Sequence, residues 1–264
     1  MRKKIAIIGG GNLGTAMAEG LLASGFCQPK EITITRRRKE LLENFLAKGC
    51  KVHSNNKKAV KESEVILLAI KPYNYQAVIE EIKAELKPQK HLIISVITGV
   101  WMADLQKAIG QKIPIVRAMP NTAIAIRQSM TCLAQNGVAK THINYAEQLF
   151  AQLGKTVVIQ DKLMDAATVL GACGTAYAMR FVRANIQGGI EIGFDAPTAS
   201  LIAAQTIKGA ASLLLEKGTH PEQEIDKVTT PMGCTIAGLN EMEHQGFSSA
   251  LIKGLKTSYQ KIEK

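Results

Sequence analysis

The chain has 264 residues, of which 46% are hydrophobic and 21% charged, a composition typical of a globular protein with one or two apolar cores. The net charge of +11 favours anionic partners, but the Lys and Arg residues are spread along the whole chain without an RNP, zinc-finger or helix-turn-helix pattern. No stretch approaches the roughly 20 uninterrupted apolar residues of a membrane span. We therefore expect neither a nucleic-acid partner nor a membrane partner.

The cysteines, the histidines and the N-terminus narrow the class of protein further. Five cysteines lie far apart without a CxxC pair, and the five histidines are scattered without an HExxH motif, so we expect neither disulfides nor a metal site. The N-terminus begins basic and turns apolar, but the apolar run is short and leads directly into a glycine-rich turn. We interpret it as a first strand and not a secretory signal, and we expect a cytoplasmic protein.

In the first 160 residues, short apolar and β-branched runs alternate with helical patterns. The runs predict strands at residues 4–9, 31–35, 65–70, 91–96, 113–119, 130–134 and 155–159. Helices are predicted over about Leu13–Ala23 and Lys39–Lys48. Strands that alternate with helices are typical of βαβ units, so we expect a parallel sheet with right-handed crossovers.

The pattern changes after about Gln160, where no convincing strand follows. Helical patterns, the first of them rich in Ala and Gly, predict helices at residues 165–193, 197–218, 235–243 and 248–262. Pro197 falls in the first turn of the second helix and Gly218 lies just past its end, where these residues are favoured. The sequence thus predicts an α/β domain at residues 1–160 and an all-α domain at residues 161–264.

A GxGxxG motif lies between the first predicted strand and the first predicted helix. In this context Gly9 allows a tight turn, Gly11 lets the backbone approach a pyrophosphate, and Gly14 lets the helix pack close to the strand. The N–H groups of Asn12 and Leu13 at the helix start then face the phosphates. A glycine turn without a ligand is the alternative, but the strand–loop–helix context favours a Rossmann-type dinucleotide-binding domain.

The end of the second predicted strand indicates which dinucleotide binds. A fold that binds NAD usually has Asp or Glu there, to hold the ribose 2′-hydroxyl. This chain has Thr35, followed by Arg36, Arg37 and Arg38. Arginine suits a 2′-phosphate through charge-assisted hydrogen bonds, so the sequence predicts NADPH, with NADH as a second possibility. The alternative interpretation is that these arginines form a solvated helix start.

Several segments, spread over nearly the whole chain, resemble the pyrroline-5-carboxylate reductase family. They are IGGGNLGTAMAEGLL (8–22), LAIKP (68–72), RAMPNTAIAI (117–126), GACGTAY (171–177), AAQTIKGAASLL (203–214) and HPEQEIDKVTTPMGCTIAGLNEMEHQGF (220–247). The last is the most discriminating, since it is similar to the family's V-T-S-P-G-G-T-T-I-A-G-L. The resemblance implies reduction of 1-pyrroline-5-carboxylate to L-proline by hydride transfer from NADPH, the last step of proline biosynthesis.

The resemblance also implies roles for particular residues. The Thr235 hydroxyl would lie near the ring nitrogen of the imine, as the catalytic contact. The substrate carboxylate would be held by the backbone at the start of a helix formed by Met232, Gly233, Cys234 and Thr235. The alternative for Thr235 is an ordinary helix N-cap, a position that Thr favours.

Further cofactor contacts are expected at the carboxyl ends of two other predicted strands, where open α/β sheets bind ligands. These residues are Ala69, Lys71, Pro72, Met119, Pro120, Asn121 and Thr122. By the resemblance, Asn121 and Thr122 lie beside the nicotinamide and the Lys71–Pro72 loop lies near the cofactor. The family's C-terminal helices interlock between subunits, so a homodimer or a higher multiple of a dimer is expected.

The chain departs from the family pattern at several positions. Met232 replaces a glycine, Cys234 a common Thr, and Glu224 an aliphatic residue. The family's SGSGP run is altered at Gly171, Ala172, Cys173 and Thr175. A different cyclic imine substrate and a non-catalytic, nucleotide-binding regulatory paralogue therefore remain alternatives. A β-hydroxyacid dehydrogenase is disfavoured, because such enzymes carry a catalytic Lys on the interdomain helix and no Lys lies between Asp165 and Ile192.

Overall fold

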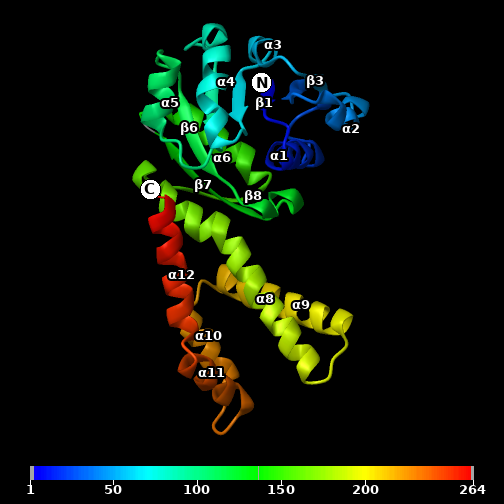
Figure 1. Cartoon of the computed structure of the whole chain (residues 1–264), viewed down its shortest axis with the longest axis vertical. Coiled ribbons are helices and arrows are strands. Elements are labelled where there is room, and N and C mark those ends of the chain that lie inside the picture. Colours follow the sequence, from blue (N-terminus) through cyan, green and yellow to red (C-terminus); the bar gives the residue numbers. More distant parts are fainter. Residues whose placement is uncertain (1–2, 136, 263–264) are drawn as a thin grey trace. The chain divides into compact units, whose positions relative to one another are not determined.

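The computed structural model describes residues 3–135 and 137–262 (Figure 1). Two compact units divide the described chain, the first ending at Cys173 and the second running from Gly174 to Ile262. The sequence predicts a boundary after residue 160, whereas the units divide after Cys173. The reason is that the segment between these positions forms short helical turns, from which Met164 inserts into the core of the first unit.

The first unit is built on one sheet of eight strands in the order β3-β2-β1-β4-β5-β6-β7-β8. The strands are β1 Ile5–Ile8, β2 Ile32–Thr35, β3 Lys51–His53, β4 Val65–Leu68, β5 Leu92–Ser95, β6 Ile115–Met119, β7 Ser129–Gln135 and β8 Gly154–Val158. All seven predicted strands are present, and β3 is an addition. The order reverses direction between β1 and β4, as in Rossmann-type sheets.

The expectation of an all-parallel sheet is wrong at one strand. Strand β7 runs antiparallel to β6 and parallel to β8. The connection between β6 and β7 holds only residues 120–128, including a 3-10 helix at Thr122–Ile126. A parallel pair needs a crossover of a dozen or more residues, so this short connection turns the chain back.

Both faces of the sheet are buried, which explains the continuous apolar runs in its strands. Alternate residues of β1 enter two separate cores: Ile5 and Ile7 belong to one, and Ala6 and Ile8 to the other. Helices α1 Asn12–Ala23, α2 Glu43–Ala47 and α6 Lys140–Ala151 cover the first face. Helices α3 Asn56–Lys61, α4 Tyr75–Ile82 and α5 Met102–Ile109 cover the second face (Figure 1).

The described part of the second unit is helical. It contains α8 Gly174–Glu191, α9 Ala196–Lys217, α10 Pro221–Val228, α11 Cys234–His244 and α12 Phe247–Ile262. The predicted single helix over 165–193 is three segments: α7 Met164–Ala167, a π-helix Thr168–Cys173, and α8. The predicted helix 197–218 corresponds to α9, which Asp195 caps by accepting the Thr198 N–H at 3.0 Å. Helix α10 was not predicted.

Few side chains of the second unit are buried. Among its described residues only Ala199 and Ala203 are buried, whereas Leu201, Ile202 and Leu215 on α9 are exposed. By length and composition, α9 is the one described helix that could cross a membrane, and 11% of the relevant window is buried. A single such helix is weak evidence for a membrane protein. The exposed apolar side chains show that this unit lacks a complete core of its own.

Candidate cofactor and substrate site

The loop after β1 has a shape that requires glycine at two positions. Gly9 has a φ of +108°, and a Cβ atom there would collide with the carbonyl group of Ala69. A Cβ atom at Gly14 would collide with the carbonyl oxygen of Gly9. The N–H groups of Gly9 and Gly10 donate to the carbonyl oxygen of Thr35, at 3.2 and 2.7 Å. The loop is therefore packed between the ends of β2 and β4, where the strand order reverses.

Gly11 differs from these glycines, because a Cβ atom there would meet no atom within 4 Å. It is the N-cap of α1, no side chain caps that helix, and its first turn holds no acidic residue. The first N–H groups of α1 therefore have no capping side chain at the positive end of the helix, beside the open space at Gly11. This cradle fits the pyrophosphate of a dinucleotide, which needs N–H donors and close approach of the backbone.

Arg36 connects the end of β2 to the glycine loop. Its Nη1 atom donates to the carbonyl oxygen of Gly10 at 2.9 Å, and its backbone N–H donates to the carbonyl oxygen of His53 at 3.1 Å. Arg37 and Arg38 are exposed. Arg36 therefore helps to fix the loop as well as offering its remaining N–H donors at the place expected for the 2′-phosphate.

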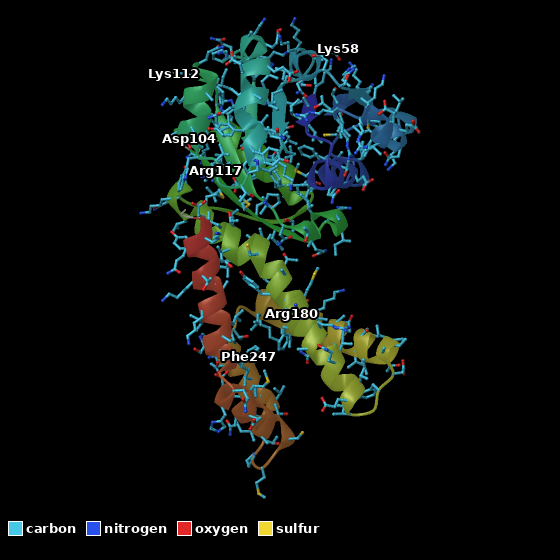
Figure 2. All side chains as sticks on the ribbon, in the orientation of Figure 1. Lys58, Asp104, Lys112, Arg117, Arg180 and Phe247 are labelled. Atoms are coloured by element: carbon cyan, nitrogen blue, oxygen red, sulfur yellow. The ribbon has the colours of Figure 1, made fainter. Side chains whose placement is uncertain are left out.

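His53, at the end of the neighbouring strand β3, is kept towards its neutral form. Burial lowers the pKa of the His53 imidazole, and the positive charge of Lys58 on α3 lowers it further (Figure 2). Glu62 raises that pKa more weakly, and its own pKa is lowered because it accepts a hydrogen bond from Lys51. The positive charge near this strand end therefore comes from Arg36, Lys51 and Lys58, because His53 is kept towards its neutral form.

The other predicted cofactor loops lie at the same edge of the sheet. The paired residues Ile8 and Thr35, Ile8 and Leu68, and Leu68 and Ser95 bring the carboxyl ends of four neighbouring parallel strands together. Ala69 continues from β4 and donates its N–H to the carbonyl oxygen of Ile8 at 2.9 Å. Lys71 and Pro72 are exposed at the start of the next 3-10 helix. Met119 and Pro120 are buried at the end of β6, and Thr122 is exposed.

Asn121 is held by four hydrogen bonds, one of which is the Ile124 N–H donating to its backbone carbonyl oxygen at 3.1 Å. Its Oδ1 atom accepts the Ala123 N–H at 3.0 Å, and its backbone N–H donates to Ser129 Oγ at 3.0 Å. Its Nδ2 atom donates to the carbonyl oxygen of Gly171, in the π-helix, at 3.2 Å. Ser129 is only 2% exposed and its Oγ lies 3.2 Å from Thr131 Oγ1. The position of Asn121 is therefore set by β7 and by the π-helix as well as by its own loop.

The predicted substrate residues belong to the second unit. Gly233 donates its N–H to the carbonyl oxygen of Thr230 at 2.9 Å and is the N-cap of α11, which no side chain caps. Thr235 is the second residue of that helix and is exposed. The alternative interpretation of Thr235 as an N-cap is therefore wrong, because Gly233 occupies that position.

Met232 takes up an unfavourable backbone conformation in the same turn. Its φ is +60°, in the left-handed region, and its side chain is fully exposed. Pro231 precedes it, and this Pro-then-positive-φ order is that of a type II turn, whose third residue is usually Gly. The left-handed conformation costs a non-glycine residue about 1–2 kcal/mol. The turn thus keeps the shape that a glycine would give it.

Comparison with known proteins decides the family. Residues 161–264 match the family described as pyrroline-5-carboxylate reductase dimerisation, and residues 4–99 match NADP oxidoreductase coenzyme F420-dependent. The chain is 41% identical to pyrroline-5-carboxylate reductase 2 of Dictyostelium discoideum, over 99% of this chain and 93% of that protein. It is 45% identical to pyrroline-5-carboxylate reductase 1 of that organism over 97% of this chain, but spans only 49% of that protein. A solved pyrroline-5-carboxylate reductase from Coxiella burnetii is 30% identical, with a TM-score of 0.93 over 100% of this chain and 98% of its own.

The chain belongs to the pyrroline-5-carboxylate reductase family. The resemblance drawn from its motifs is thereby confirmed, and so is the expectation of an NADP-dependent oxidoreductase that acts on a C=N bond. Within residues 3–135 and 137–262, no three His, Cys, Asp or Glu side chains lie together in a way that could hold a metal ion.

Sequence reasoning missed three residues that shape the first unit of this reductase family member. They are Ser129, Arg117 and Asp161. Only Arg117 left a signal, as a single charge within the predicted strand 113–119. A charge in a strand buried on both faces requires a partner, and the partner is Asp161, at 2.7 Å.

Proposed function

We propose that this chain reduces 1-pyrroline-5-carboxylate to L-proline with NADPH, as the last step of proline biosynthesis. The observation that carries the proposal is the identity to the second Dictyostelium reductase along nearly the full length of both chains. The uncapped start of α1 beside Gly11 supports it, because that cradle suits a dinucleotide.

Bound NADPH supplies the hydride, from carbon 4 of its nicotinamide ring. In the first unit, Gly9 and Gly14 shape the loop, Gly11 admits the pyrophosphate, and Arg36 binds the 2′-phosphate. The Asn121 loop orients the nicotinamide end. The other residues that we propose to contact the cofactor are Asn12, Leu13, Thr35, Arg37, Ala69, Lys71, Pro72, Met119, Pro120 and Thr122.

In the second unit, the start of α11 binds the substrate. The backbone N–H groups that follow Gly233 hold the carboxylate, because no side chain caps this helix. The Thr235 hydroxyl contacts the ring nitrogen, while Met232 and Cys234 border the carboxylate. A protonated imine is already electrophilic, so orientation and one polar contact are what the protein has to supply.

The test of this function is an assay of NADPH oxidation in the presence of pyrroline-5-carboxylate. The oxidation is monitored by absorbance, and proline is measured as the product. Other cyclic imine carboxylates, of different ring size or with the C=N bond placed differently, are offered in parallel. Turnover with a higher kcat/KM for pyrroline-5-carboxylate supports the proposal. A preference for another imine contradicts the substrate, and NADPH binding without turnover of any imine favours a regulatory paralogue.

The Arg36→Ala variant tests the cofactor. We expect NADPH to be preferred over NADH, and the substitution to weaken NADPH more than NADH, by about 1–3 kcal/mol for a lost charge-assisted contact. Kd for both cofactors is measured by fluorescence titration, with Arg38→Ala as the matched control. Because Arg36 also holds Gly10, equal losses for both cofactors would show that it acts only on the loop.

A homodimer, or a multiple of one, is the proposed assembly. The family match of residues 161–264 is to a dimerisation region, and the exposed Leu201, Ile202 and Leu215 need a cover. A second copy of the chain would bury these apolar side chains, so no membrane is needed to cover them. Light scattering at low micromolar concentration is expected to give at least twice the mass of one chain. A stable and fully active monomer would refute the proposal.

We also propose a cytoplasmic location for this biosynthetic reductase. Fractionation of cells that express the full-length protein checks it.

A further inference from the structure

A buried arginine lies in the strand that leads to the Asn121 loop. Arg117 is 1% exposed and is the largest fully buried side chain among the described residues. It belongs to β6, which ends at Met119 (Figure 2). Its Nη1 atom donates to Asp161 Oδ1 at 2.7 Å, and its Cζ atom lies 5.1 Å from the centre of the Trp101 ring.

This ion pair is screened little by water. The Asp161 side chain is 24% exposed and the Arg117 side chain 2%, and the guanidinium lies over the ring of Trp101. Arg117 Nη2 is buried and has no hydrogen-bond partner among the described residues. Such a pair often adds little to stability compared with apolar residues of the same size, so its presence points to a demand on geometry.

The pair fastens β6 to the segment that follows β8. Asp161 begins that segment, which continues through α7 into the π-helix. The same segment meets the end of β6 a second time, where the Gly171 carbonyl accepts the Asn121 Nδ2 hydrogen bond at 3.2 Å. Displacing the segment at its start would therefore also disturb the contact that holds Asn121.

We propose that Arg117 and Asp161 are positioning residues for hydride transfer, acting through Gly171 on Asn121. This inference rests on the proposed function, since it assumes that the Asn121 loop orients the nicotinamide. Neither residue is placed against the substrate or cofactor. Their role is to hold the loop within the small displacement that reaction geometry tolerates, since an error of about 1 Å can cost 100-fold in rate.

The first test compares Asp161→Asn with Glu80→Gln. Glu80 forms an ion pair with Lys83 of the same length, 2.7 Å, but that pair is exposed on the surface near the end of α4. We expect Asp161→Asn to lower kcat by about tenfold or more, with KM for NADPH changed by less than about threefold. Glu80→Gln is expected to leave both unchanged. Asp161→Glu, which keeps the charge, is expected to recover part of kcat.

Two readouts do not depend on turnover. Amide hydrogen exchange of residues 117–126 is expected to speed up in Asp161→Asn and not in Glu80→Gln. Trp101 is the only tryptophan of the chain, so its emission reports on the guanidinium that lies over its ring and is expected to shift. If the wild-type chain turns over no imine, the proposed function fails, while faster exchange in the loop still supports the positioning role.

A second variant separates positioning from folding. Arg117→Met combined with Asp161→Leu removes both charges and keeps apolar volume, so it is expected to fold even if a lone charge does not. We expect a melting temperature near that of the wild type together with a lowered kcat and faster exchange of the loop. Normal kcat in this variant, or loop exchange equal to that of the wild type, would overturn the inference.

Discussion

Thr235→Ala is expected to lower kcat by roughly 10- to 1000-fold, the loss that follows when one positioned hydrogen bond to the reacting group is removed. The proposed contact between this hydroxyl and the imine nitrogen would form mainly as the hydride arrives, so the transition state would lose more than the bound substrate does. NADPH affinity should change little, because the glycine loop and Arg36 belong to the first unit. Steady-state kinetics with cofactor titration measures both quantities.

The conservative variant Thr235→Ser is the control, and it should keep most of the activity because it keeps the hydroxyl. Since Gly233 is the N-cap of α11, the Ala variant removes no helix cap. We therefore expect the melting temperatures of both variants to stay close to that of the wild type. Near-normal turnover by Thr235→Ala would remove Thr235 from the active site.

Gly11→Ala is expected to separate cofactor binding from folding. A methyl group at Gly11 meets no protein atom, so the free energy of unfolding should fall by less than about 1 kcal/mol, as for a poorer N-cap. The methyl would stand where the backbone has to approach the pyrophosphate. NADPH binding should weaken by about 1.4 kcal/mol or more, which is tenfold in Kd.

The Gly14→Ala variant is the matched comparison. A Cβ atom there collides with the Gly9 carbonyl, so this variant should lose stability as well as cofactor affinity. Chemical unfolding without cofactor and fluorescence titration with NADPH measure the two effects. If Gly11→Ala binds NADPH as tightly as the wild type, the pyrophosphate does not lie at this helix start.

The parts of the fold that the sequence predicted are those with strong local patterns. The apolar runs at 65–70 and 91–96 are long enough to show strands buried on both faces, and GxGxxG lies between a strand and a helix. Strand β3 holds three residues, too few for an alternation to be visible. The direction of β7 depends on the length of the connection before it, which periodicity does not reveal.

The candidate site was predicted in part for a similar reason. The glycines and the Asn121 loop belong to short motifs that can be recognised locally. Ser129 reaches Asn121 because the reversed strand β7 begins at the edge where β6 ends. Arg117 and Asp161 lie 44 residues apart, so only the folded chain shows their contact. Polar pairs of this kind come from tertiary structure and leave no spacing signal.

The π-helix between Thr168 and Cys173 changes how the next helix has to be numbered. A wider turn takes in an extra residue, so every later side chain is rotated by about 100° from the direction that an unbroken α-helix would give it. A helical wheel drawn through α7 and α8 in one register therefore assigns the residues of α8 to the wrong sides. Grafting or alignment of this helix with an uninterrupted one needs a one-residue offset at this point, or the matched positions face different directions.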